Sequence, residues 1–398
     1  MKILAKVITS LSSRQRVIIL AVIAVAVSAP DARSQQNRSE QDSIRLNATL
    51  VEVPAIVTDR TGKFVADLAR GDFAIFEDGK RQEVALFTAV KQPFTAVLVL
   101  DTSNSAEDRL RAIQNLALEF AREARPDDRL MVISFDNEVR RLTDFTSSYA
   151  EIEEAVKSAE SGFGKLFYEA VTTALEQLKD VEGRRAVILF TDGIDMRSIE
   201  ATSESALRKA EEMGAVIYAV RFETRWWVES EARRQQKEQP ESKVPFSVDG
   251  RIPLPPDFGG PDPAPAGFPP VRAPRIEIGT SRPSPPVTII DGNNRRTIQT
   301  APPDKITENL DKLYGEADAF LQTISSKTGG LVFRAETFDN TRSAFHAIAE
   351  ELRNQYLIGY YPSNERNDGK YRKIKVEVAR KDAQVRARPG YRPEASRQ

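Results

Sequence analysis

Carboxylate and hydroxyl side chains follow two apolar stretches of this 398-residue sequence. Asp101-Thr102-Ser103-Asn104-Ser105 comes directly after the apolar run at 96–100, and Thr191-Asp192-Gly193 comes after the run at 186–190. Ligands of open α/β sheets bind beyond the carboxyl ends of the strands, so both loops are expected at one edge. Carboxylates and hydroxyls are hard oxygen ligands that suit Mg²⁺. The pattern predicts a site for Mg²⁺ or Mn²⁺ formed by Asp101, Ser103, Ser105 and Asp192.

The same residues have ordinary structural interpretations. Ser103 or Ser105 could cap the helix that follows, a position that serine favours. Asp101 could cap the same turn, and Asp192-Gly193 is a common turn signal. Each alternative is reasonable for one residue taken singly. Their joint occurrence at the ends of two matched strands favours a site.

The composition excludes several other kinds of chemistry. The chain has no Cys and one His, with 57 Lys and Arg against 58 Asp and Glu. The absence of Cys excludes a disulfide scaffold, an iron–sulfur cluster and a thiol nucleophile. A single His argues against a histidine zinc site or a Ser-His-Asp triad, and the balanced charge argues against a nucleic-acid partner. These exclusions favour a binding protein over an enzyme.

A regular alternation of strands and helices is expected to position the site. Continuous apolar, β-branched runs of this kind are typical of strands buried on both faces of a parallel sheet; they cover 96–100, 130–135, 186–190 and 215–220. Helical periodicity lies between them, at 105–124, 166–178 and 202–213. The sequence therefore predicts an α/β domain with a doubly wound, mostly parallel sheet. Its first part covers 93–222.

A proline-rich stretch interrupts this domain. Sixteen of the 23 Pro lie between Pro240 and Pro303. We interpret 223–314 as a largely disordered insertion that serves as a linker or a recognition surface. The α/β pattern resumes at 315–355, with a helix at 317–327, so the insertion lies within one domain.

The two ends of the chain carry alternating β patterns. Residues 44–92 alternate with period two between turn signals, and 356–398 contain further strands. Because about 45 residues are too few for an independent sandwich, we expect the C-terminal strands to complete the N-terminal ones. The result is a β-sandwich-like module formed from both ends.

The N-terminus resembles an export signal. Four basic residues and no acid precede 11 apolar residues at 17–27, and small residues follow. Eleven residues are too few to span a bilayer, which needs about 20. We therefore interpret 1–32 as a signal peptide, cleaved or retained as an anchor, and 33–43 as a disordered tether. The predicted location is the periplasm, the cell surface or the medium, with no membrane span beyond the signal segment.

The Asp-x-Ser-x-Ser motif at 101–105 with Thr-Asp-Gly at 191–193 resembles the von Willebrand factor A domain. The resemblance covers about 95–222 and 315–355, and the flanking β-segments look like those of exported bacterial proteins of that superfamily. It implies a metal-ion-dependent adhesion site with Ser103 and Ser105 as direct ligands. Asp101 and Asp192 would bind directly or through water. An acidic group of a protein or surface partner would complete the metal shell.

One position departs from the family pattern. The family takes a further ligand from a Thr in a Gly-Gly-Thr-x-Leu-Tyr-Asp-like segment, and aligning on Tyr168 places Lys165 at that position. A protonated lysine has no lone pair for a metal. Its ammonium could instead pair with Asp101 and Asp192 as a built-in counter-ion, to which an anionic partner group could dock. Alternatively, Lys165 swings outward and a weak metal still binds.

Three functions follow from these observations. The first is an exported, non-enzymatic protein that binds a partner through this acidic site. The second is a structural or assembly protein with a degenerate metal site. The third, which has the least support, is a metal-assisted hydrolase.

Overall fold

The computed structural model describes residues 49–103, 107–162, 164–238, 287–291, 294–298, 304–335 and 338–394. The expected signal peptide and tether, and most of the proline-rich stretch, lie outside these ranges. In the described part of the chain, none of the helices combines the length and apolarity needed to cross a bilayer.

A six-stranded sheet forms the centre of the larger domain. Its strand order is β12-β9-β8-β5-β6-β7, and every neighbouring pair is parallel except β6 and β7. The strands are β5 (Phe94–Asp101), β6 (Arg129–Phe135), β7 (Val139–Arg141), β8 (Arg184–Thr191), β9 (Val216–Phe222) and β12 (Val332–Ala335). The predicted fold class, a doubly wound and mostly parallel sheet, is confirmed.

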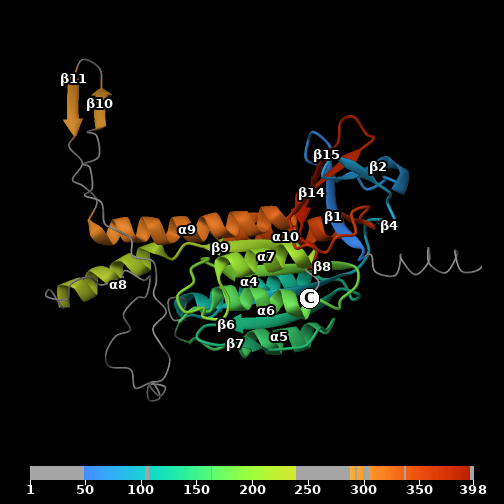
Figure 1. The fold of residues 1–398 in the computed structure, drawn as a ribbon. Coiled ribbons are helices and arrows are strands. Elements are labelled where there is room, and N and C mark those ends of the chain that lie inside the picture. Colours follow the sequence, from blue (N-terminus) through green and yellow to red (C-terminus); the bar gives the residue numbers. More distant parts are fainter. Residues whose placement is uncertain are drawn as a thin grey trace, which may run out of the picture. The chain divides into compact units, whose positions relative to one another are not determined.

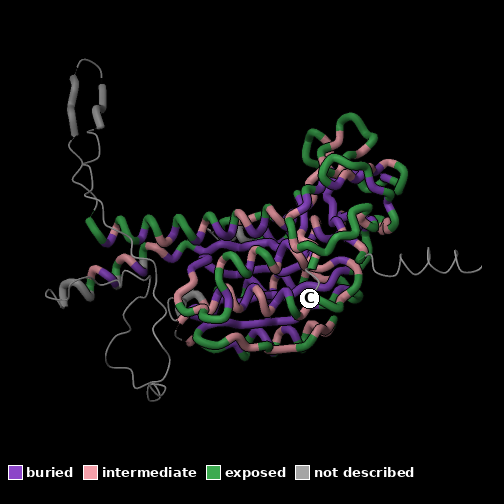
Figure 2. The backbone as a smooth tube through the Cα atoms, in the orientation of Figure 1, coloured by how far each residue is buried: buried purple, intermediate pink, exposed green. Residues whose placement is uncertain are grey.

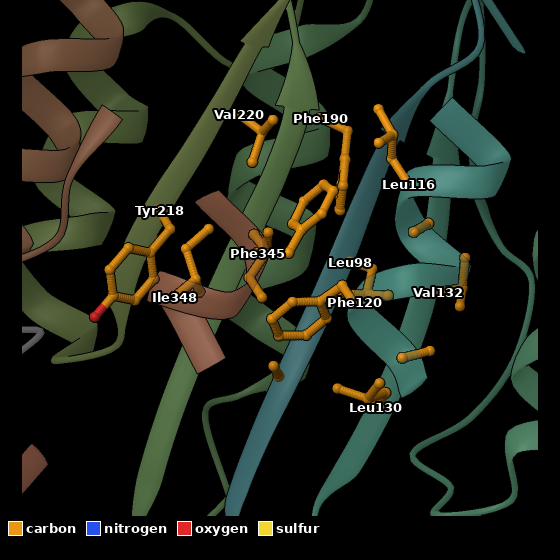
Figure 3. Close-up of a cluster of buried hydrophobic side chains, with 14 of the residues drawn as sticks. Leu98, Leu116, Phe120, Leu130, Val132, Phe190, Tyr218, Val220, Phe345 and Ile348 are labelled. Carbon is orange, nitrogen blue, oxygen red and sulfur yellow. The ribbon is translucent and has the colours of Figure 1, made fainter. Parts of the chain in front are cut away.

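Helices cover both faces of this sheet (Figure 1). One face packs against α4 (Glu107–Glu123), α5 (Tyr149–Lys157) and α10 (Phe338–Arg353), and the other against α6 (Phe167–Gln177), α7 (Ser203–Met213) and α9 (Lys305–Thr328). Leu98 of β5 faces the first layer with Phe120, Phe190 and Phe345 (Figure 3), whereas Val97 faces the second. Strands buried on both faces explain the continuous apolar runs of the sequence (Figure 2).

Strands from both ends of the chain form a second module. One sheet has the order β15-β1-β13-β4 and the other β16-β14-β2-β3. The elements are β1 (Val51–Thr58), a 3₁₀ turn (Arg70–Asp72), β2 (Phe73–Glu77), β3 (Lys80–Gln82), β4 (Leu86–Thr88), β13 (Gln355–Tyr360), β14 (Arg372–Val378), β15 (Gln384–Ala387) and β16 (Gly390–Tyr391). Apolar residues of both sheets share one core, which includes Val53, Ile75, Tyr356 and Ile374.

Two helices flank the proline-rich stretch, where the sequence predicted an insertion up to residue 314. The first is α8 (Arg225–Glu238), and α9 begins at Lys305 rather than at Ala317 as expected. Asp304 caps α9 by accepting a hydrogen bond from the Thr307 amide at 2.9 Å, which explains the earlier start. The two helices share an apolar cluster that includes Val228 and Leu310. In the sequence between these helices, β10 (Val287–Asp291) and β11 (Asn294–Ile298) pair as a hairpin.

Candidate functional site

The carboxylates of Asp101 and Asp192 meet beside the carboxyl-terminal edge of the sheet. Asp101 is the last residue of β5, and Asp192 directly follows β8, its parallel neighbour. Both residues are almost completely buried, at 3% and 2% exposure. Parallel pairing of two adjacent strands that end at equivalent positions therefore brings these acids together, as their spacing predicted.

Lys165 lies between the two acids. Its Nζ donates to Asp192 Oδ2 at 2.6 Å and to Asp101 Oδ2 at 3.4 Å. The lysine is itself 2% exposed. We call Asp101, Lys165 and Asp192 the charged centre. The Lys165 ammonium lies against the carboxylate oxygens to which a metal would bind.

Neighbouring hydroxyls and amides satisfy the remaining sides of the carboxylates. Thr191 Oγ1 donates to Asp101 Oδ2 at 2.9 Å, and Thr224 Oγ1 donates to Asp192 Oδ2 at 2.8 Å. The backbone amides of Ser103 and Ile194 donate to the other oxygen of Asp101 and Asp192, at 3.2 and 3.0 Å. Asp101 also accepts a hydrogen bond from the Ser103 side chain, so each acid accepts at least three hydrogen bonds.

Thr224 extends this network to α9. The Tyr314 hydroxyl of α9 lies 2.5 Å from Thr224 Oγ1, and it is the donor because Thr224 donates to Asp192. Sequence reasoning missed Thr224 and Tyr314, which come from positions 32 and 122 residues after Asp192 and belong to no local motif. Thr191 was visible within Thr-Asp-Gly but was not assigned a role.

The electrostatics of the charged centre follow from burial and mutual attraction. Burial alone would lower the pKa of Lys165, but the charges of Asp101 and Asp192 outweigh it and raise that pKa. Burial would raise the pKa of Asp192, yet the close Lys165 ammonium lowers it. For Asp101 the effect of burial is larger than the opposing effect of Lys165, which is more distant, and the pKa of Asp101 is raised. Lys165 is therefore held in its charged form, and Asp192 is its closer ionic partner.

The described residues do not fit a divalent ion in this arrangement. The oxygen donors have the right chemistry, but Lys165 contacts one oxygen of each carboxylate, and a cation there would lie against the ammonium. No group of three or more His, Cys, Asp or Glu suited to a metal occurs among the described residues. Ser103 is buried beside Asp101, whereas Ser105 lies outside the described residues. The metal-binding role of these four residues stays a prediction.

Comparison with known proteins identifies the larger domain. Residues 96–194 match the family model of the von Willebrand factor type A domain. The chain contains a von Willebrand A domain. Its match spans β5 to the residues just after β8, so it includes Asp101, Lys165 and Asp192. No curated protein sequence matches the chain.

Several solved structures resemble the chain at low identity. An aerotolerance-related membrane protein of Bacteroides fragilis is 17% identical, with a TM-score of 0.36, and the match covers 65% of this chain and 98% of that one. BatB of Bacteroides thetaiotaomicron is 18% identical, with a TM-score of 0.36 and coverages of 65% and 97%. The von Willebrand domain of the type V pilus tip protein Mfa5 of Porphyromonas gingivalis is 23% identical, with a TM-score of 0.26 and coverages of 28% and 41%.

The segment before α6 holds Lys165 in place in the A domain. The Lys165 carbonyl accepts hydrogen bonds from the amides of Met196 and Arg197, at 3.0 and 3.1 Å. A Cβ on Gly162 would clash with the side chain of Asp136, which favours glycine there. Gly164 has a φ of +85°, which also favours glycine. The backbone conformation and the close packing therefore explain why glycine occupies these two positions.

Residues 193–202, which we call the rim loop, lie between the charged centre and α7. Glu169 of α6 accepts hydrogen bonds from the amides of Ile199 and Glu200, at 2.7 and 2.9 Å. Asp195 accepts from the Tyr168 amide at 3.1 Å, at the start of α6. The side chain of Ile199 is nevertheless 90% exposed. The A domain therefore presents an aliphatic side chain to solvent on a loop whose backbone is fixed.

Proposed function

We propose that the chain is an exported, non-enzymatic protein that binds a protein or surface partner through the rim loop of its A domain. The exposure of Ile199 on a loop anchored by Glu169 is the observation that carries this proposal. The basic and apolar N-terminal pattern supports export. The match to an A domain supports binding as the general role.

An anchored loop is well suited to bind another protein. A side chain held in its binding position before contact loses less conformational entropy on association. Ile199 offers an apolar contact, and the exposed Arg197, two residues earlier, offers a cation. We therefore expect a partner surface that combines an apolar pocket with a carboxylate.

In this proposal the charged centre has an indirect role, because it is buried beneath the rim loop and does not contact the partner. Because Lys165 is 2% exposed, a partner's acidic group would meet Arg197 before it could reach the buried ammonium. The hydrogen bonds from Met196 and Arg197 to the Lys165 carbonyl fix the start of the rim loop against the charged centre. In this proposal the charged centre positions the rim loop, and the rim loop makes the contact.

Site-specific photocrosslinking of the full chain in its native cells tests the proposal. A photoreactive amino acid at position 199 should crosslink to one defined partner, and Arg197→Glu should weaken that crosslink. The matched control is position 331, where Leu331 is also exposed but precedes the parallel strand β12 and so lies at the opposite edge of the sheet. Equal crosslinking from both positions, or none from position 199, would exclude the rim loop as the binding surface.

A further inference from the structure

We propose that Lys165 is the resident cation of this A domain, so that the charged centre is complete without a divalent metal. The claim about the ion stands on the geometry of the charged centre alone. Its consequence, that partner binding through the rim loop is independent of metal, rests on the proposed function. The two parts are therefore tested separately.

The position of the ammonium is the first argument. Nζ lies 2.6 Å from Asp192 Oδ2 and 3.4 Å from Asp101 Oδ2, so a single cation bridges both carboxylates. A divalent ion bound to the same oxygens needs distances of about 2.0–2.1 Å for Mg²⁺. At that distance from Asp192 Oδ2, the metal would displace the ammonium or lie in repulsive contact with it. Lysine and metal therefore exclude one another.

The hydrogen bonds around the two acids are the second argument. Asp101 accepts from Lys165, Thr191 and the Ser103 amide, and Asp192 accepts from Lys165, Thr224 and the Ile194 amide. Buried polar groups are costly when they lack partners. Here each carboxylate has at least three donors, one of which is the charged lysine, and the Ser103 side chain is a further donor to Asp101. The carboxylates of the charged centre are therefore satisfied by side chains and backbone amides of the chain itself.

The third argument is that Lys165 has little freedom to leave. Its carbonyl accepts from the Met196 and Arg197 amides, and the amide of the next residue, Leu166, donates to the Asp136 carbonyl at 2.9 Å. Phe167, which begins α6, is fully buried. An outward swing would also leave two buried carboxylates without a cation. The backbone on both sides of Lys165 thus fixes the side chain toward Asp101 and Asp192.

Titration of the full chain with Mn²⁺, followed by electron paramagnetic resonance, tests the ion. The wild type should show no saturable Mn²⁺ site. Lys165→Thr, which restores the family's hydroxyl, should bind Mn²⁺ at least about tenfold more tightly than any residual binding by the wild type. Thermal unfolding provides a second measurement, because Mg²⁺ should raise the melting temperature of Lys165→Thr and leave that of the wild type unchanged. Lys157→Thr is the matched control, since Lys157 is exposed on α5.

Two results would overturn the inference. Saturable Mn²⁺ binding by the wild type that disappears in Asp192→Asn would show that a metal binds despite Lys165. A folded Lys165→Thr that still binds no Mn²⁺ would show that the lysine does not occupy a metal position. If Lys165→Thr does not fold, comparing the Mn²⁺ titrations of the wild type and Asp192→Asn still decides whether a metal binds beside Lys165.

The crosslink at position 199 tests whether partner binding is independent of metal. With metal-independent binding, the crosslink should persist unchanged when EDTA is present. Its loss in EDTA would refute metal independence. If no crosslink forms with or without EDTA, the proposed function has failed, whereas the Mn²⁺ result on Lys165 remains valid.

Discussion

The charged centre of the A domain and a second buried cluster in the β-module both contain buried carboxylates, but these are stabilised by different sets of partners. In the β-module Glu77 accepts hydrogen bonds from the hydroxyls of Tyr360 and Tyr391, at 2.7 and 2.9 Å, and from Arg372 at 3.4 Å. We call these four residues the Glu77 cluster. It has one acid with a cation and two neutral donors, whereas the charged centre has two acids that share one cation.

The two clusters also differ in the elements that form them. All four residues of the Glu77 cluster belong to strands, and they join β2 to three strands from the other end of the chain. The charged centre takes Lys165 and Asp192 from loops at one edge of a sheet. The comparison indicates that the Glu77 cluster joins the two ends of the chain, whereas the charged centre supports a surface loop.

The largest expected effect is that of Lys165→Met. It removes the cation that contacts both buried carboxylates, so the free energy of unfolding should fall by about 3–5 kcal/mol. Denaturant unfolding measures it, with Lys157→Met on α5 as the control for an exposed lysine. A loss as small as that of the control would show that the carboxylates do not depend on Lys165.

Arg372→Met should have a smaller effect, about 2–3 kcal/mol. Glu77 would lose its charged partner but keep the two tyrosine hydroxyls, whereas in Lys165→Met two buried acids lose one shared cation and keep hydroxyl and amide donors. The measurement is again the free energy of unfolding. If Arg372→Met proved more destabilising than Lys165→Met, the neutral donors would not compensate for a lost cation, and this comparison would be wrong.

These differences explain how much the sequence could predict. Asp101 and Asp192 were predictable because strand periodicity and parallel pairing are local patterns that place strand ends together. Lys165 was found because the segment around Tyr168 aligned with a family motif. Thr224, Tyr314 and the partners of Glu77 were not predictable, since each comes from a distant element and is positioned only by tertiary packing. The start of α9 at Lys305 was also missed, because proline-rich sequence hid the cap at Asp304.

Tyr391→Phe tests the neutral donors of the Glu77 cluster and should cost about 1–2 kcal/mol. Burial, with Glu77 beside it, raises the pKa of Tyr391 above its ordinary value of 10.0. A raised pKa in the folded state means that the hydroxyl contributes stability below pH 10 and loses it as the pH rises further. The difference between wild type and Tyr391→Phe should therefore shrink above about pH 10. Tyr361→Phe is the control, because Tyr361 is exposed; a difference that grows with pH would contradict this assignment.

Tyr314→Phe should have the smallest effect, about 1 kcal/mol or less. Tyr391 donates directly to a buried acid, whereas the Tyr314 hydroxyl reaches Asp192 only through Thr224. The ring would remain in its apolar cluster with Ile194 and Ala317, while the hydrogen bond to Thr224 is lost. Unfolding in denaturant, compared with Tyr391→Phe under the same conditions, measures the difference. A loss equal to that of Tyr391→Phe would mean that α9 is itself a main support of the charged centre, and that the rim of the A domain depends on the helix that follows the insertion.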